Sequence, residues 1–324
     1  MNWLMRRGRM RGHFVVWGLL KINLWKMNLV RGFFLVGVLV FIAGCGSSEL
    51  PNATHNFKER ISELQFQVLP NAPPDRIYQG SGFKIILEGE NRAAYDLQQV
   101  DVKVVGLDQK YFALSNTEQT VPQLMGRSLA NPLGDKEYFE FSGVANQLFE
   151  NANEYGANYF VKASYRSKMD FADTICLNPN LYDVYDSGCK VETRKSYGGQ
   201  GAPLAVTDIE EIMYPSGAGG EAEFRIHIAN RGQGRVGVVT VGKAQLGNEE
   251  LTCEFKGQPS NGLLPGGEDT RITLKTVRFT ENVQEGVLVC KTFLKDSRSY
   301  TTTLSADFGY EYEWKRQFSL RLVR

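Results

Sequence analysis

Short runs in which apolar and polar residues alternate are the feature that most constrains how this chain can fold. In FKIILEGEN, residues 83–91, the side chains of Phe83, Ile85 and Leu87 fall on one face. VDVKVVGL at 100–107 and NYFVKASY at 158–165 alternate in the same way. Because successive side chains of a strand point to opposite sides of a sheet, this pattern predicts half-buried β-strands. Clusters such as PNAPPD at 70–75 supply the turn residues between them.

One segment departs from strand periodicity. VANQLFENANEYG, residues 144–156, has helix-compatible apolar spacing and no β-branched residue after Val144. We expect a short helix here, inserted between strands.

The second half of the chain repeats the opening of the first. In EAEFRIHIANRGQGRVGVVTVGKA, residues 221–244, alternating apolar residues precede Asn230-Arg231, as Ile85 and Leu87 precede Asn91-Arg92. A glycine-rich stretch, KVETRKSYGGQGAPL at 190–204, separates the halves. This pattern predicts two copies of one unit, a first domain over 64–195 and a second over 205–324, joined by a linker at 196–204.

The turn and strands of IHIANRGQGRVGVVTV, residues 226–241, resemble the immunoglobulin-like modules of prokaryotic cell-surface proteins, particularly the CARDB-type modules. The resemblance implies a mainly β protein of two tandem immunoglobulin-like antiparallel β-sandwiches. In such a sandwich Cys253 and Cys290 would bridge the two sheets. Leu288 stands where an antibody domain would place its corner tyrosine, so the resemblance implies a looser sandwich.

Four cysteines lie beyond the N-terminal segment and divide evenly between the halves. We expect the disulfides Cys176–Cys189 and Cys253–Cys290, and therefore an oxidising compartment. The alternative is four reduced, buried thiols. No C-x-x-C pair occurs and only two histidines follow residue 44, so no metal site is predicted.

The N-terminus reads as an export signal. Arg31 is followed by the apolar run at 32–42 and then by the small residues Ala43 and Gly44. Residues 1–44 are therefore expected to be a signal peptide or a membrane anchor. Met27 opens a segment with the proportions of a complete signal, which makes it a candidate for the true start.

Ile42-Ala43-Gly44-Cys45 resembles the lipobox of prokaryotic lipoproteins, in which the cysteine is lipidated and becomes the new N-terminus. The resemblance implies that Cys45 is the lipid attachment point, with an uncleaved short transmembrane helix as the alternative. Residues 45–63 are polar at first and contain Pro51, so we expect them to form a tether to the membrane.

Charge argues against a nucleic-acid partner. Seven basic residues and no acid lie in residues 1–44, which leaves 30 basic against 36 acidic residues beyond them. A mildly acidic body lacks the basic face that neutralises phosphates.

The sequence shows no catalytic signature. H-E-x-x-H, G-x-S-x-G and Walker-type loops are absent. GQGRVG at 232–237 matches G-x-G-x-x-G but runs into the β-branched VVTV, so we interpret it as a turn between strands rather than a dinucleotide site. No cofactor and no enzymatic activity are predicted.

Two aromatic groups remain as binding candidates. The loop LNPNLYDVYDSGC at 177–189 carries Tyr182, Asp183, Tyr185 and Asp186 between the expected disulfide partners. Such a loop could present rings and carboxylates to a sugar, a peptide or calcium, or could simply cover its own domain. Tyr310, Tyr312 and Trp314 alternate along a late strand, where core packing competes with an exposed platform.

These observations predict a membrane-anchored cell-surface lipoprotein with a binding, adhesion or structural role in the envelope and a protein or glycan ligand. The alternatives are a subunit of an extracellular filament or envelope complex, and an exported carboxylate- or metal-dependent hydrolase.

Overall fold

The computed structural model describes residues 56–179, 188–216, 219–256, 270–273, 275–276, 284–294 and 298–324. These residues form strands, turns and irregular segments without any helix, so the prediction of a mainly β protein is confirmed. Residues His55–Arg324 form one compact unit. The proposed signal at 1–44, Cys45 and most of the tether lie outside the described residues.

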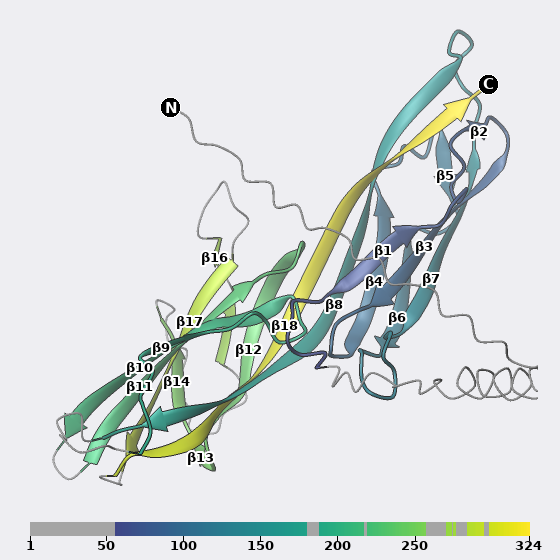
Figure 1. The fold of residues 1–324 in the computed structure, drawn as a ribbon. Coiled ribbons are helices and arrows are strands. Elements are labelled where there is room, and N and C mark those ends of the chain that lie inside the picture. The colour runs from purple at the N-terminus through teal and green to yellow at the C-terminus, as the bar shows by residue number, and fades with distance from the viewer. Residues whose placement is uncertain are drawn as a thin grey trace, which may run out of the picture. The chain divides into compact units, whose positions relative to one another are not determined.

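The strands form three sheets (Figure 1). A four-stranded sheet has the order β1 (Leu64–Val68), β3 (Gly82–Asn91), β7 (Lys136–Ala145) and β5 (Phe112–Leu114). A six-stranded sheet has the order β14 (Thr252–Phe255), β17 (Gln284–Leu294), β11 (Gly219–Asn230), β10 (Leu204–Ser216) and β9 (Arg194–Ser196), and β16 (Lys275–Thr276) also pairs with β17.

The eight-stranded sheet contains strands from both halves of the chain. Its order is β13 (Glu249–Glu250), β12 (Arg235–Leu246), β18 (Tyr300–Val323), β8 (Glu154–Leu177), β4 (Leu97–Val105) and β6 (Glu118–Leu124). In addition β15 (Thr270–Thr273) pairs with β12, and β2 (Ile77–Tyr78) runs parallel to β18. All other strand pairs in the described residues are antiparallel.

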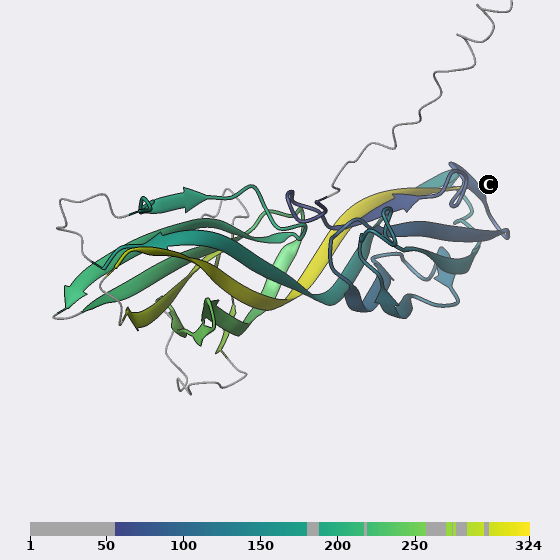
Figure 2. The same ribbon diagram turned by 60° about the horizontal axis from the view of Figure 1, so that its bottom comes forward.

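Two long strands form the centre of this sheet. β8 and β18 have 24 residues each and pair in unbroken antiparallel register from Glu154 opposite Val323 to Leu177 opposite Tyr300. Both views show them running side by side (Figures 1 and 2). On one side of this pair, β8 is hydrogen-bonded to β4 and β4 to β6. On the other side, β18 is hydrogen-bonded to β12 and β12 to β13.

The two halves place their strands in the same order. In the first half β3 lies between β1 and β7 in one sheet, and the chain then enters the eight-stranded sheet as β4. In the second half β11 lies between β10 and β17, and the chain then enters the same sheet as β12. The strands that close each half, β8 and β18, are the central pair.

The asparagine that ends β3 makes the same bonds as the one that ends β11. Asn91 Oδ1 accepts from the backbone N–H of Ala93 at 3.0 Å, and its Nδ2 donates to the carbonyl of Tyr95 at 3.0 Å. Asn230 Oδ1 accepts from the N–H two residues later at 3.0 Å, and its Nδ2 donates to the carbonyl four residues later at 2.8 Å. The following residues 232–234 form the turn before β12, which confirms the interpretation of GQGRVG.

The alternating apolar residues predicted to face the core do so. One contiguous buried cluster contains Phe83, Ile85 and Leu87, and the corresponding residues Phe224, Ile226 and Ile228 of the second half. Between the sheets, ring centroids lie 4.9 Å apart for Phe66 of β1 and Trp314 of β18. Each outer sheet therefore buries its apolar face against the shared sheet, as in a β-sandwich.

The short helix expected at 144–156 is wrong. β7 continues to Ala145, β8 begins at Glu154, and turns connect them. Arg324 donates to the carbonyls of Phe149 and Glu150 at 3.3 and 2.8 Å. Tertiary hydrogen bonds thus satisfy carbonyl groups that a helix would have satisfied locally.

The expected linker at 196–204 lies between β9, which ends at Ser196, and β10, which begins at Leu204. These two strands are antiparallel neighbours in the six-stranded sheet, so the segment is the connection within a strand pair. The division into domains at 64–195 and 205–324 stays a prediction.

Candidate functional site

A polar groove of about 530 Å³ crosses the middle of the eight-stranded sheet. Four neighbouring strands line it, in the order β4, β8, β18 and β12. Its lining residues are Gln99, Asp101, Ser164, Tyr165, Arg166, Arg235, Gly237, Glu311, Tyr312 and Glu313. The groove therefore lies where the two halves of the chain meet within one sheet.

Irregularities in both flanking strands mark this position. The register between β4 and β8 shifts between Gln98 and Asp101, and Gln99 adopts a left-handed backbone with φ of 53°. The register between β12 and β18 shifts between Val236 and Val239. Such bulges bend a strand and re-aim its side chains, and they are frequent beside functional sites.

The charged groups of the groove alternate in sign across the strands. Arg166 lies opposite Glu311 in the β8–β18 register, and Glu313 lies opposite Arg235 in the next pair. Among the described residues, no ion pair within 4.0 Å involves any of these four side chains. Arg166 instead donates a short hydrogen bond to Gln99 Oε1.

Asp101 completes the polar lining on the β4 side. Its Oδ1 accepts a hydrogen bond from Thr120 of β6 at 2.6 Å, which orients the carboxylate. The groove thus combines two guanidinium groups with three carboxylates, and most of their hydrogen-bonding capacity faces solvent.

Tyr165 and Tyr312 belong to the strands that carry the groove, but their buried rings lie on the core-facing side of the sheet. Tyr165 and Tyr312 lie directly opposite each other, with ring centroids 5.3 Å apart. Tyr312 donates to Glu63 Oε2 at 2.5 Å and accepts from the Gly234 N–H at 2.6 Å. Burial, and next the adjacent Glu63 carboxylate, raise the pKa of Tyr312, so its phenol stays protonated and keeps these links. These buried contacts hold β18 and the turn before β12 together, and the charged groups of the groove project from the opposite face.

This arrangement can bind a polar or charged ligand through several charge-assisted hydrogen bonds. Within the described part of the chain, no three His, Cys, Asp or Glu side chains are grouped as metal ligands would be. In the same residues, no helix is long and apolar enough to cross a bilayer.

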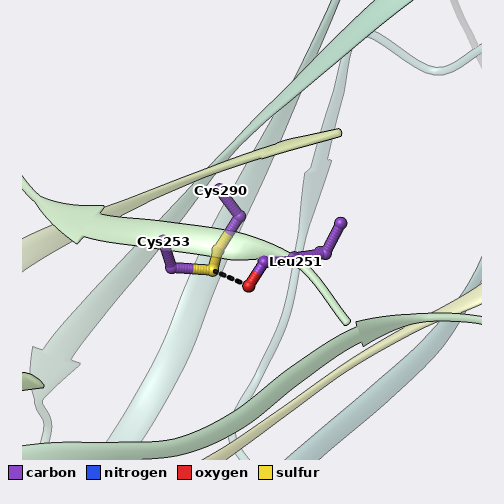
Figure 3. Close-up of a disulfide and its surroundings, with 3 residues drawn as sticks. All are labelled: Leu251, Cys253 and Cys290. Atoms are coloured by element: carbon purple, nitrogen blue, oxygen red, sulfur yellow. Dashed lines mark hydrogen bonds between the residues drawn. A yellow bond between two sulfur atoms is a disulfide. The ribbon is translucent and has the colours of Figure 1, made fainter. Parts of the chain in front are cut away.

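Both predicted disulfides are present. Cys253 and Cys290 have Cα atoms 4.0 Å apart, and Cys176 and Cys189 have Cα atoms 5.9 Å apart. The expectation that Cys253–Cys290 bridges two sheets is wrong. The two residues face each other on β14 and β17 of the six-stranded sheet, so the bond joins neighbouring strands (Figure 3).

Cys253 also approaches the chain just before its strand. Its Sγ lies 3.9 Å from the carbonyl oxygen of Leu251, the contact drawn dashed in Figure 3. A disulfide sulfur has no proton to donate, so this is a packing contact. This contact places Leu251, the residue before β14, next to the disulfide.

The remaining predicted site residues divide into two groups. The loop candidates Tyr182, Asp183, Tyr185 and Asp186 lie outside the described residues, and their role stays a prediction. Tyr310, Tyr312 and Trp314 are 3%, 2% and 7% exposed and belong to the core, so the exposed-platform alternative is wrong.

Sequence reasoning did not identify the groove residues. Each charged residue occupies an outward position of an alternating strand, where charge is ordinary. The groove emerges from the register of four strands that are distant in sequence. Gln98-Gln99 is the local signal that was available, because two polar residues there break the alternation of β4.

No protein-family model matches this chain, and no curated protein matches it. The secreted serine protease VesC from Vibrio cholerae is 12% identical with a TM-score of 0.20, and the match covers 75% of this chain and 49% of that one. This chain thus spans about half the length of the protease.

Two adhesin structures also match. The Enterococcus faecalis MSCRAMM ACE is 8% identical, with a TM-score of 0.11 and coverage of 83% and 97%. The S. aureus collagen adhesin CNA is 11% identical, with a TM-score of 0.11 and coverage of 82% and 93%. At these TM-scores none of the three similarities carries a functional argument.

Proposed function

We propose that this protein is an exported, membrane-anchored cell-surface binding protein whose groove recognises a protein segment or a glycan. The observation that carries the proposal is the groove itself. It presents Arg235, Glu311 and Glu313 without ion-pair partners among the described residues, on the outward face of the eight-stranded sheet. Charged groups that are not already paired within the protein can form charge-assisted hydrogen bonds with a ligand.

The two disulfides support a location outside the cytosol. Two disulfides are typical of oxidising compartments and rare in the cytosol. The lipobox-like Ile42–Cys45 sequence supports lipid attachment at Cys45, with the segment between Cys45 and the compact unit that begins at His55 as the tether. A lipid-anchored protein of this kind would present the groove at the envelope surface.

The groove is tested by ligand arrays. Full-length protein in detergent micelles is applied to a glycan array and to a peptide array, and the best ligand is titrated against variants. We expect Arg235→Ala to weaken binding by about tenfold or more, because a guanidinium–anion pair is lost. Arg321→Ala is the matched control, since Arg321 is exposed on the same strand as Glu313 but eight positions away. Equal affinity for both variants, or no ligand on either array, would overturn the groove as the binding site.

The anchor has a separate test. Cells expressing the protein are fed a clickable fatty acid, and the protein is isolated and imaged. We expect label on the unsubstituted protein and none on Cys45→Ser. Label that persists in Cys45→Ser places the lipid elsewhere, and an unlabelled protein retained in the membrane supports the transmembrane alternative.

A further inference from the structure

Glu211 of β10 is a buried carboxylic acid that does not line the groove, and among the described residues one of its oxygens has no hydrogen-bond partner. β10 turns Ile209, Glu211 and Met213 inward, and these side chains are 3%, 6% and 9% exposed. Within the described residues, Glu211 Oε1 is buried and accepts no hydrogen bond. A buried acceptor without a donor is unfavourable, so such a group requires an explanation.

Glu211 lines a second pocket, of about 190 Å³. Its walls include Ile175 of β8, Thr301 of β18, Tyr197 and the Cys176–Cys189 disulfide. It therefore lies between the eight-stranded and six-stranded sheets, and the disulfide forms part of one wall.

The nearby basic and phenolic groups are already engaged. Lys195 Nζ lies 2.5 Å from Asp173 Oδ2, and Tyr197 donates to the same oxygen at 2.7 Å. The other charged residues of the lining, Lys190 and Glu192, are exposed and opposite in sign. Among the described residues, Glu211 Oε1 therefore has no donor, and the exposed Lys190 and Glu192 offset each other in charge.

We propose that this pocket binds a small primary ammonium compound whose N–H groups donate to the Glu211 carboxylate. An ammonium group supplies both the missing donors and the compensating charge. The volume accommodates a short aliphatic amine, and Ile175 and Ile209 offer an apolar surface to its carbon chain. This site is independent of the groove and of the ligand proposed there.

Titration of the carboxyl group gives a direct readout. Burial raises the pKa of Glu211 to about 7, and the other titratable groups that line the pocket are Lys190, Glu192, Lys195 and Tyr197. A bound cation favours the ionised carboxylate, so n-butylammonium should lower the pKa of Glu211, whereas n-butanol should not. By linkage, affinity for n-butylammonium should fall about tenfold between pH 8 and pH 6.

The experiment uses full-length protein carrying ¹³C-labelled glutamate, with the carboxyl signal of Glu211 followed by NMR. Glu211→Gln should abolish binding of n-butylammonium, and Glu254→Gln, the same change on an exposed site of β14, should not affect it. Equal affinity for n-butanol, affinity independent of pH, or no binding at millimolar amine would overturn the proposal. If Glu211→Gln does not fold, the pH dependence and the n-butanol comparison on the unsubstituted protein still decide.

Discussion

At the residue scale, two asparagines hold the points where the chain passes from an outer sheet to the shared one. Asn91 is fully buried, and besides its local bonds its Nδ2 donates to the Leu124 carbonyl at 3.0 Å. Asn230 Nδ2 likewise reaches Gln284 Oε1 at 3.1 Å. A short side chain with both a donor and an acceptor is required here, because buried backbone groups must be paired.

We therefore expect Asn91→Ala to lower the free energy of unfolding by about 2–4 kcal/mol, since it leaves buried carbonyl and N–H groups without partners. Urea denaturation measures the change. Asn158→Ala, at an exposed position of β8, is the control and should change stability by less than about 0.5 kcal/mol. A loss for Asn91→Ala no larger than that of the control would contradict this role.

Glu211 gives a pH-dependent prediction. Its pKa is raised by burial to about 7 from the ordinary value of 4.5, so the folded state holds this proton more tightly than the unfolded state. The contribution of this group to stability is therefore greatest below pH 4.5 and falls as the pH rises towards 7. A shift of this size corresponds to roughly 3 kcal/mol.

Comparison with Glu211→Gln isolates that contribution. Stability of the unsubstituted protein, relative to the variant, should decline by about 3 kcal/mol between pH 4.5 and pH 7.5 in denaturation curves. Parallel pH profiles for the two proteins would show that Glu211 titrates normally.

At the element scale, each disulfide restrains a different half of the chain. Cys253–Cys290 staples the four-residue strand β14 to β17 and closes a separation of 37 residues. Cys176–Cys189 closes a separation of 13 residues beginning at the end of β8. A longer closed loop restricts the unfolded chain more strongly.

Replacing Cys253 and Cys290 by serine should therefore destabilise the protein by about 4 kcal/mol, compared with about 3 kcal/mol for the Cys176/Cys189 double variant. Guanidinium denaturation of both variants under non-reducing conditions gives the comparison. A larger loss for the Cys176/Cys189 variant would indicate that native contacts, and not loop closure, dominate.

At the scale of the whole molecule, the unbroken pairing of β8 with β18 joins strands that close different halves of the chain. The buried residues of both halves form one contiguous cluster. Cooperative unfolding is expected when no weak boundary separates the parts of a core.

We predict one unfolding transition for residues 56–324. Phe66→Ala and Phe224→Ala, each a buried ring in a different half, should each lower stability by about 3–5 kcal/mol and should reduce amide protection in both β3 and β11. Hydrogen exchange with mass spectrometry reads the two strands separately. Loss of protection confined to the substituted half would establish two independent domains.

The sequence by itself determined the strands, because alternation of apolar and polar residues is a local property that any half-buried strand requires. Phe83, Ile85 and Leu87 could be assigned to a core without coordinates, and so could the cysteine pairs. The tertiary structure alone decided how strands distant in sequence are joined. It set the shared sheet of β8 and β18, the placement of Cys253–Cys290 within one sheet and the absence of the helix at 144–156. The groove and the Glu211 pocket depend on that same register and packing, since side chains from four or more separate segments line each of them.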